Sequence, residues 1–79
     1  MNNKEKYDAA FMEIFNVDSS ELGTDFTAET VEKWDSITQM ALINKMEDNF
    51  MIMFEIEDIV EFVSYDAGIE ILKKYSIAV

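Results

Sequence analysis

Ser36 lies where a helix is predicted to begin, directly after an acid in the run Trp34-Asp35-Ser36-Ile37. A serine in the first turn of a helix has two common roles. Its hydroxyl can cap the helix, or it can stay exposed as the attachment point of a prosthetic group. The rest of the chain favours the second role, because it contains almost no other groups that could carry out chemistry.

The composition removes most catalytic and metal-binding alternatives. The 79 residues include no cysteine and no histidine, so the common zinc ligand sets cannot form. A Ser-His or Cys-His nucleophile pair cannot form either. The two glycines, Gly23 and Gly68, are isolated, which excludes a glycine-rich phosphate loop. If this protein works with a thiol, the thiol must come from another molecule.

The charge of the chain narrows the class of partner. Seventeen acidic residues against six basic ones give a net charge of −11. Such a surface disfavours nucleic acid and anionic membranes as partners, and no apolar run approaches the ~20 residues that span a bilayer. The N-terminus also lacks the apolar stretch of a signal peptide. We expect a monomeric cytoplasmic protein that meets basic partner proteins, although acidity can also serve solubility alone.

The apolar spacing predicts one all-α domain over residues 1–79, a small four-helix bundle. Helices are expected over residues 4–15, 36–49, 57–62 and 65–75, with an extended connection over residues 51–56. The long connection between the first two helices should be held by its apolar residues, Leu22, Phe26, Val31 and Trp34, and could include a helical turn capped by Thr27. Gly68 is expected to allow close approach of another helix.

The second predicted helix has a distinct inner and outer face. Leu42, Ile43, Met46 and Phe50 should point into the core, whereas Ile37 and Met40 should be partly exposed. Asp35 or Ser36 can cap this helix, and Ser36 with Gln39 three residues later fits the capping-box pattern.

This order of elements resembles the acyl carrier protein family over nearly the whole chain. The most specific part is Asp35-Ser36-Ile37, which is similar to the Asp-Ser-Leu motif of that family. Leu42, Glu47, Asp48, Phe50 and Ile52 stand where the family has its leucine, acidic pair, phenylalanine and isoleucine. The fold implied is the acyl-carrier bundle, with a long connection after the first helix and a short third helix.

The resemblance implies that Ser36 carries a 4′-phosphopantetheine arm. A phosphopantetheinyl transferase would attach the arm from coenzyme A, with Asp35 helping the transferase and its magnesium to engage. The thiol of the arm would hold an acyl, hydroxyacyl or aminoacyl group as a thioester. The chain would then be a carrier and co-substrate, not an enzyme. A phosphodiester at the helix N-terminus would meet the positive end of the helix dipole and free backbone N–H groups.

The resemblance also implies docking residues for enzymes with basic patches. These residues are Ile37, Met40, Glu47 and Asp48. Three departures, Thr38, Ala41 and Lys45, reduce the negative charge of the second helix. They favour a discrete carrier of polyketide or other specialised biosynthesis over one of housekeeping fatty-acid synthesis. For Ile37 and Met40, packing into the core remains an alternative to docking. For Glu47 and Asp48, the alternative is an ordinary solvated helix face.

Other function classes remain open at this point. The main alternative is a small acidic helical interaction module that is never modified. A calcium-binding protein is disfavoured because no segment has the spacing of an EF-hand loop. Mass measurement after incubation with a transferase and coenzyme A would separate the carrier from the interaction module.

Overall fold

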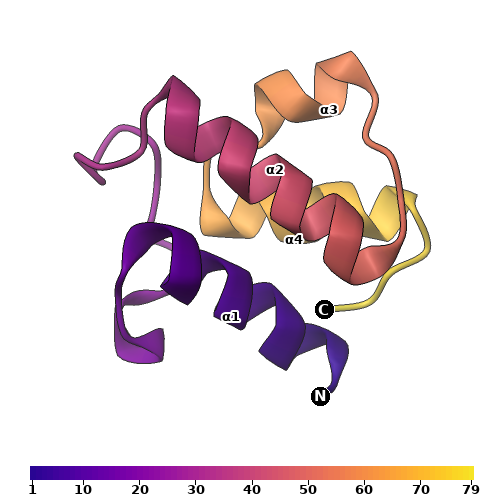
Figure 1. The fold of residues 1–79 in the computed structure, drawn as a ribbon, viewed down its shortest axis with the longest axis horizontal. Helices are drawn as coiled ribbons and strands as arrows, with labels where there is room; N and C mark the ends of the chain where they lie inside the picture. Colours follow the sequence, from indigo (N-terminus) through magenta and orange to yellow (C-terminus); the bar gives the residue numbers. More distant parts are fainter.

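The computed structural model describes all residues 1–79 and contains four α-helices and no strand (Figure 1). The helices are α1 (Asn3–Phe15), α2 (Ser36–Phe50), α3 (Ile56–Glu61) and α4 (Tyr65–Lys74), and a short 3-10 helix, η1 (Ser19–Glu21), follows α1. The all-α prediction is confirmed, and the predicted ends of the helices are correct to within one residue. Residues 52–55 form an extended connection, as expected.

The helix ends follow from local side-chain chemistry. Asn2 caps α1, and its Oδ1 accepts a bond of 2.8 Å from the N–H of Glu5. Ser64 caps α4 in the same way through a bond of 2.9 Å from the N–H of Ala67. Asn16 and Met51 end α1 and α2 in the left-handed conformation, both with φ of 55°. Asparagine adopts this conformation readily, so only the ending at Asn16 was predictable.

An aromatic cluster on α1 holds the long α1–α2 connection in place. The ring of Phe11 lies 5.7 Å from that of Phe26, 5.9 Å from that of Trp34 and 5.4 Å from that of Tyr65, measured between centroids. Phe26 and Trp34 are buried, and Leu22 and Val31 pack against the same core. The predicted anchors of the connection are therefore confirmed. The suggested helical turn capped by Thr27 is present, because the N–H of Val31 bonds to the Thr27 carbonyl at 2.9 Å and the Thr27 hydroxyl accepts a bond of 3.2 Å from the N–H of Thr30. Thr27 also bridges to Ser64.

Gly68 allows the close approach that the sequence predicted. A Cβ built at this position would overlap the hydroxyl of Tyr7 and the ring of Phe62. Both side chains are fully buried, and the Tyr7 hydroxyl donates a bond of 2.6 Å to the carbonyl of Tyr65. Helices α1 and α4 therefore meet at a point where only glycine fits without displacement.

The inner face of α2 was predicted largely correctly. Leu42, Ile43 and Met46 are buried, and Phe50 is half-buried against the core. Lys45, which lies on the side of α2 that faces α1, forms an ion pair of 2.8 Å with Glu13. On α4, Tyr65, Ile71 and Leu72 are buried, and Ile69 is half-buried.

Helix α3 is anchored by a buried polar contact in addition to Ile59, which packs against the core. Asp58 is its only buried residue; its carboxylate accepts a bond of 2.6 Å from the Tyr75 hydroxyl and pairs with the ammonium of Lys74. The bond from Lys74, followed by that from Tyr75, lowers the pKa of Asp58. The connection between α3 and the end of α4 therefore depends on an ionised carboxylate.

The lowered pKa gives a pH-dependent prediction for the anchor at Asp58. A carboxyl whose pKa is lower in the folded state stabilises the fold fully above its ordinary pKa of about 4, and loses this contribution as the pH falls through the folded value. We therefore expect the free energy of unfolding to fall more steeply below about pH 4 in the wild type than in Asp58→Asn. Denaturant melts of both proteins at several pH values would measure the difference; parallel pH profiles would contradict it.

Candidate functional site

The candidate site lies at the N-terminal end of α2, where the main chain leaves the long connection. Asp35 is the N-cap, and its Oδ1 accepts bonds of 3.0 Å from the N–H of Ile37 and 2.9 Å from that of Thr38. The Thr38 hydroxyl completes a capping box by accepting a bond of 2.8 Å from the N–H of Asp35. The predicted capping box between Ser36 and Gln39 is therefore wrong, because Asp35 and Thr38 take these roles.

Ser36 is left without a structural role for its side chain. It is exposed, it is the first residue of α2, and its hydroxyl makes no hydrogen bond. Helix formation therefore does not need the oxygen of this serine, in contrast to Ser64, whose hydroxyl caps α4. Capping by Ser36 is therefore excluded, and its hydroxyl is exposed.

Asp35 also changes the electrostatics expected at the start of α2. The backbone N–H of Thr38 makes the largest contribution to lowering the pKa of Asp35, so this acid is ionised at neutral pH. Its carboxylate occupies the N–H groups of Ile37 and Thr38, and the N–H of Gln39 bonds to the carbonyl of Asp35 at 2.8 Å. Of the backbone N–H groups expected to be free at the start of α2, only the N–H of Ser36 therefore remains free. A phosphate on Ser36 would sit beside a negative charge, where a cation would relieve the repulsion.

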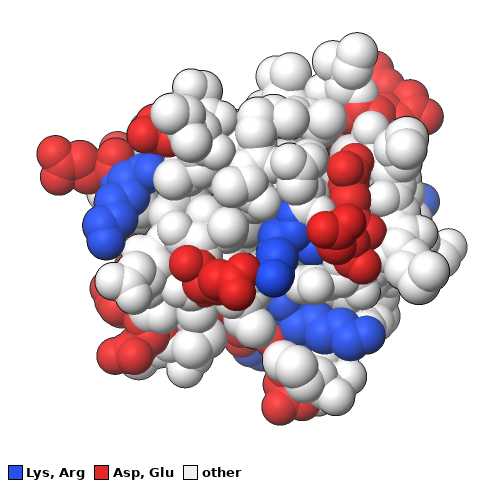
Figure 2. Space-filling view, in the orientation of Figure 1, with Lys and Arg blue, Asp and Glu red and all other residues white.

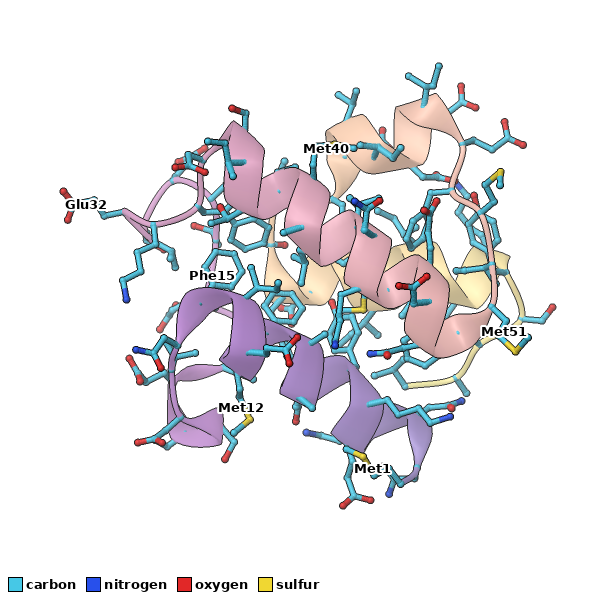
Figure 3. All side chains as sticks on the ribbon, in the orientation of Figure 1. Met1, Met12, Phe15, Glu32, Met40 and Met51 are labelled. Atoms are coloured by element: carbon cyan, nitrogen blue, oxygen red, sulfur yellow. The ribbon has the colours of Figure 1, made fainter.

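Exposed apolar side chains lie on α2 within four residues of Ser36 and on α3, whose end is bonded to the first turn of α2 through Gln39. We call them the α2–α3 face: Ile37 and Met40 on α2, Ile56 and Val60 on α3, and Val63 just after α3. Ile37 is 79% exposed, Met40 47% and Val60 69%. Figure 3 shows Met40 directed toward α3, and Figure 2 shows an uncharged surface over the first half of α2 and over α3. Core packing of Ile37 and Met40 is excluded by their exposure.

The two predicted docking acids lie apart from Ser36 and differ in environment. Eleven or twelve residues along α2 correspond to roughly 17 Å. The carboxylate of Glu47 accepts a bond of 2.9 Å from the N–H of Phe54 and so holds the α2–α3 connection. Asp48 is exposed. Glu47 is therefore not a free surface acid, whereas Asp48 remains available to a partner.

Lys45 does not add a positive charge beside Met40. At 100° per residue the two side chains point about 140° apart around α2, and Lys45 is paired with Glu13 on α1. Lys45 is therefore engaged within the fold, and its effect on the docking of basic partners stays a prediction. Thr38 is part of the capping box. Of the three departures from the family pattern, only Ala41 takes part in neither the cap nor an ion pair.

Several residues of the site were missed by sequence reasoning. Ile56 and Val60 were not recognised as exposed, although their i, i+4 spacing in a short helix was a usable signal. Gln39 was assigned to a cap, but it links Trp34 to the end of α3. No sequence pattern indicates that contact, because it joins residues about twenty positions apart.

No family model, curated protein or solved structure matches this chain. In addition, no helix has both the length and the apolar character required to cross a membrane.

Proposed function

We propose that this chain is an acyl carrier protein whose Ser36 carries a 4′-phosphopantetheine arm. The observation that carries the proposal is the exposed Ser36 hydroxyl at the first residue of α2, which is free of any capping role and follows an ionised Asp35. The four-helix order, the long anchored connection and the short α3 support an acyl-carrier type of fold. Fold alone would be a weak argument.

The residues present fit attachment of such an arm. The Ser36 oxygen would attack the phosphorus of the pantetheine phosphate in coenzyme A, and the bond to the adenosine bisphosphate would break, with the serine proton passing to a base on the transferase. Asp35 would help to hold a magnesium ion of the transferase complex near this serine. The arm supplies a terminal thiol, a group that the chain lacks. The protein is thus a co-substrate and not an enzyme.

The α2–α3 face would serve as the docking surface for the transferase and for acyl-transfer enzymes. Two of its exposed apolar side chains, Ile37 and Met40, lie within four residues of Ser36 on α2, and exposed apolar surface of this kind commonly marks an interaction site. Asp48 and the net charge of −11 would steer partners with basic patches, mainly by raising association rates. Thr38 and Ala41 still favour partners from a specialised biosynthetic pathway over housekeeping fatty-acid enzymes.

The proposal is tested by intact mass measurement. The purified protein is incubated with magnesium, coenzyme A and a broad-specificity phosphopantetheinyl transferase, and a parallel sample lacks the transferase. We expect the mass of one arm to be added only when the transferase is present. The unmodified interaction module predicts no gain in either sample.

Docking through the α2–α3 face gives a further prediction. Met40→Glu places a charge beside Ser36 without altering the cap, so we expect the KM of the transferase for this protein to rise several-fold while kcat changes little. Met53→Glu is the matched control, because Met53 is 81% exposed in the connection after α2. Steady-state kinetics of arm transfer would measure both variants. Equal KM values for the two variants would exclude a role for Met40 in docking.

A further inference from the structure

The amide of Gln39 uses all of its main hydrogen-bonding capacity inside the protein. Its Oε1 accepts a bond from the indole N–H of Trp34. Its Nε2 donates bonds of 2.9 Å to the carbonyl of Ile59 and 2.9 Å to that of Phe62. An amide has two N–H donors and one carbonyl oxygen, so a single side chain joins the end of the long connection, the first turn of α2 and the end of α3.

Helix α3 has few other attachments. Only one of its six residues is buried, its N-cap Glu55 makes no side-chain capping bond, and Ile56 and Val60 point to solvent. The buried residue, Asp58, ties α3 to Lys74 and Tyr75 near the end of α4. Apart from the partly buried Ile59 and the buried ring of Phe62 at its C-cap, two polar attachments hold this helix: Asp58 on the side of α4, and Gln39 on the side of α2. Elements with few buried apolar contacts open at low free-energy cost.

We propose that Gln39 is a positioning residue that holds α3 against α2 and so keeps the two halves of the α2–α3 face in register beside Ser36. The consequence for arm transfer rests on the proposed function; the effect on α3 does not. When Gln39 is lost, α3 moves away from α2, and Val60 no longer keeps its place relative to Met40. The Ser36 hydroxyl and the Asp35 cap stay intact, because neither bonds to the Gln39 side chain.

Two substitutions separate the contacts of Gln39. Gln39→Met has a similar length but can make none of the three bonds. Gln39→Glu keeps an acceptor for Trp34, but its carboxylate faces the carbonyls of Ile59 and Phe62 and cannot donate to them. Asn44→Leu is the matched control. The Asn44 amide is exposed on α2 and makes no hydrogen bond, and leucine is an apolar side chain of similar size.

Amide hydrogen exchange reports the attachment of α3 to Gln39. The NMR signal of the Trp34 indole N–H reports the bond between Trp34 and Gln39. Trp34 is the only tryptophan, so its signal is unambiguous. In both Gln39 variants we expect the amides of residues 56–63 to exchange about 10-fold faster, with α1 unchanged. The indole signal should shift strongly in Gln39→Met and less in Gln39→Glu. If the amides of residues 56–63 exchanged no faster in the two Gln39 variants than in Asn44→Leu, the inference would be overturned.

Kinetics of arm transfer test the positioning role. We expect Gln39→Met to raise the transferase KM several-fold and to leave kcat within about twofold of the wild type, whereas Asn44→Leu leaves both unchanged. A Gln39→Met protein with faster exchange in α3 but wild-type KM would overturn the positioning role. A wild type that gains no arm at all contradicts the proposed function instead, and hydrogen exchange still decides whether Gln39 holds α3.

Discussion

Ser36→Ala is expected to abolish attachment of the arm while leaving the fold intact. The hydroxyl is the proposed nucleophile, and no other group in the site can replace it. Because Asp35 and Thr38 form the cap of α2, loss of this hydroxyl should change the free energy of unfolding by less than about 0.5 kcal/mol. Mass spectrometry after transferase treatment and a thermal melt measure the two effects.

Asp35→Asn is the informative companion to Ser36→Ala. It keeps a side chain that can cap α2 but removes the negative charge beside the serine. We expect slower arm transfer with a nearly unchanged melting temperature. Transfer at the wild-type rate would limit the role of Asp35 to capping, and arm attachment in Ser36→Ala would place the site on another residue.

Gly68→Ala is expected to have a large effect on stability. Alanine is favoured over glycine in a helix by about 1 kcal/mol, but the added methyl group would overlap the Tyr7 hydroxyl and the Phe62 ring. Both rings are fully buried and cannot swing into solvent. Overpacking of this kind costs typically about 1–3 kcal/mol, so we expect a net loss of up to roughly 2 kcal/mol.

Gly23→Ala provides the control for this effect. A Cβ at Gly23 would meet nothing within 4 Å, and its φ is not positive. We therefore expect the free energy of unfolding to stay unchanged or to rise by about 0.4–1 kcal/mol, because alanine restricts the unfolded chain. Chemical denaturation of both variants measures the difference. A Gly68→Ala protein as stable as Gly23→Ala would contradict the close contact between α1 and α4.

The features predicted correctly from sequence depend on local patterns. The inner and outer faces of α2 follow from residues within two turns of one another. The need for glycine at position 68 was also predictable, since glycine is unfavourable in a helix unless packing requires it. These signals were sufficient for the fold class and for the place of Ser36.

The features that were missed depend on contacts between distant residues. Asp58 pairs with Lys74, Glu47 bonds to the N–H of Phe54, and Lys45 pairs with Glu13. The sequence alone indicates that all five of these charged residues are surface charges. Only packing of the helices shows that Glu47 and Lys45 are engaged within the fold and that Asp48 is free. The choice of cap between Asp35 and Ser36 was also undecided, because both residue types cap helices well.

The most direct test of the central claim is to locate the arm by fragment mass spectrometry. The wild-type protein is treated with transferase and coenzyme A, digested, and the peptide that contains Ser36 is fragmented. The proposal predicts a single arm on Ser36 and none on the exposed serines Ser19, Ser20 and Ser76. An unmodified Ser36 peptide, or an arm on any other serine, would contradict it.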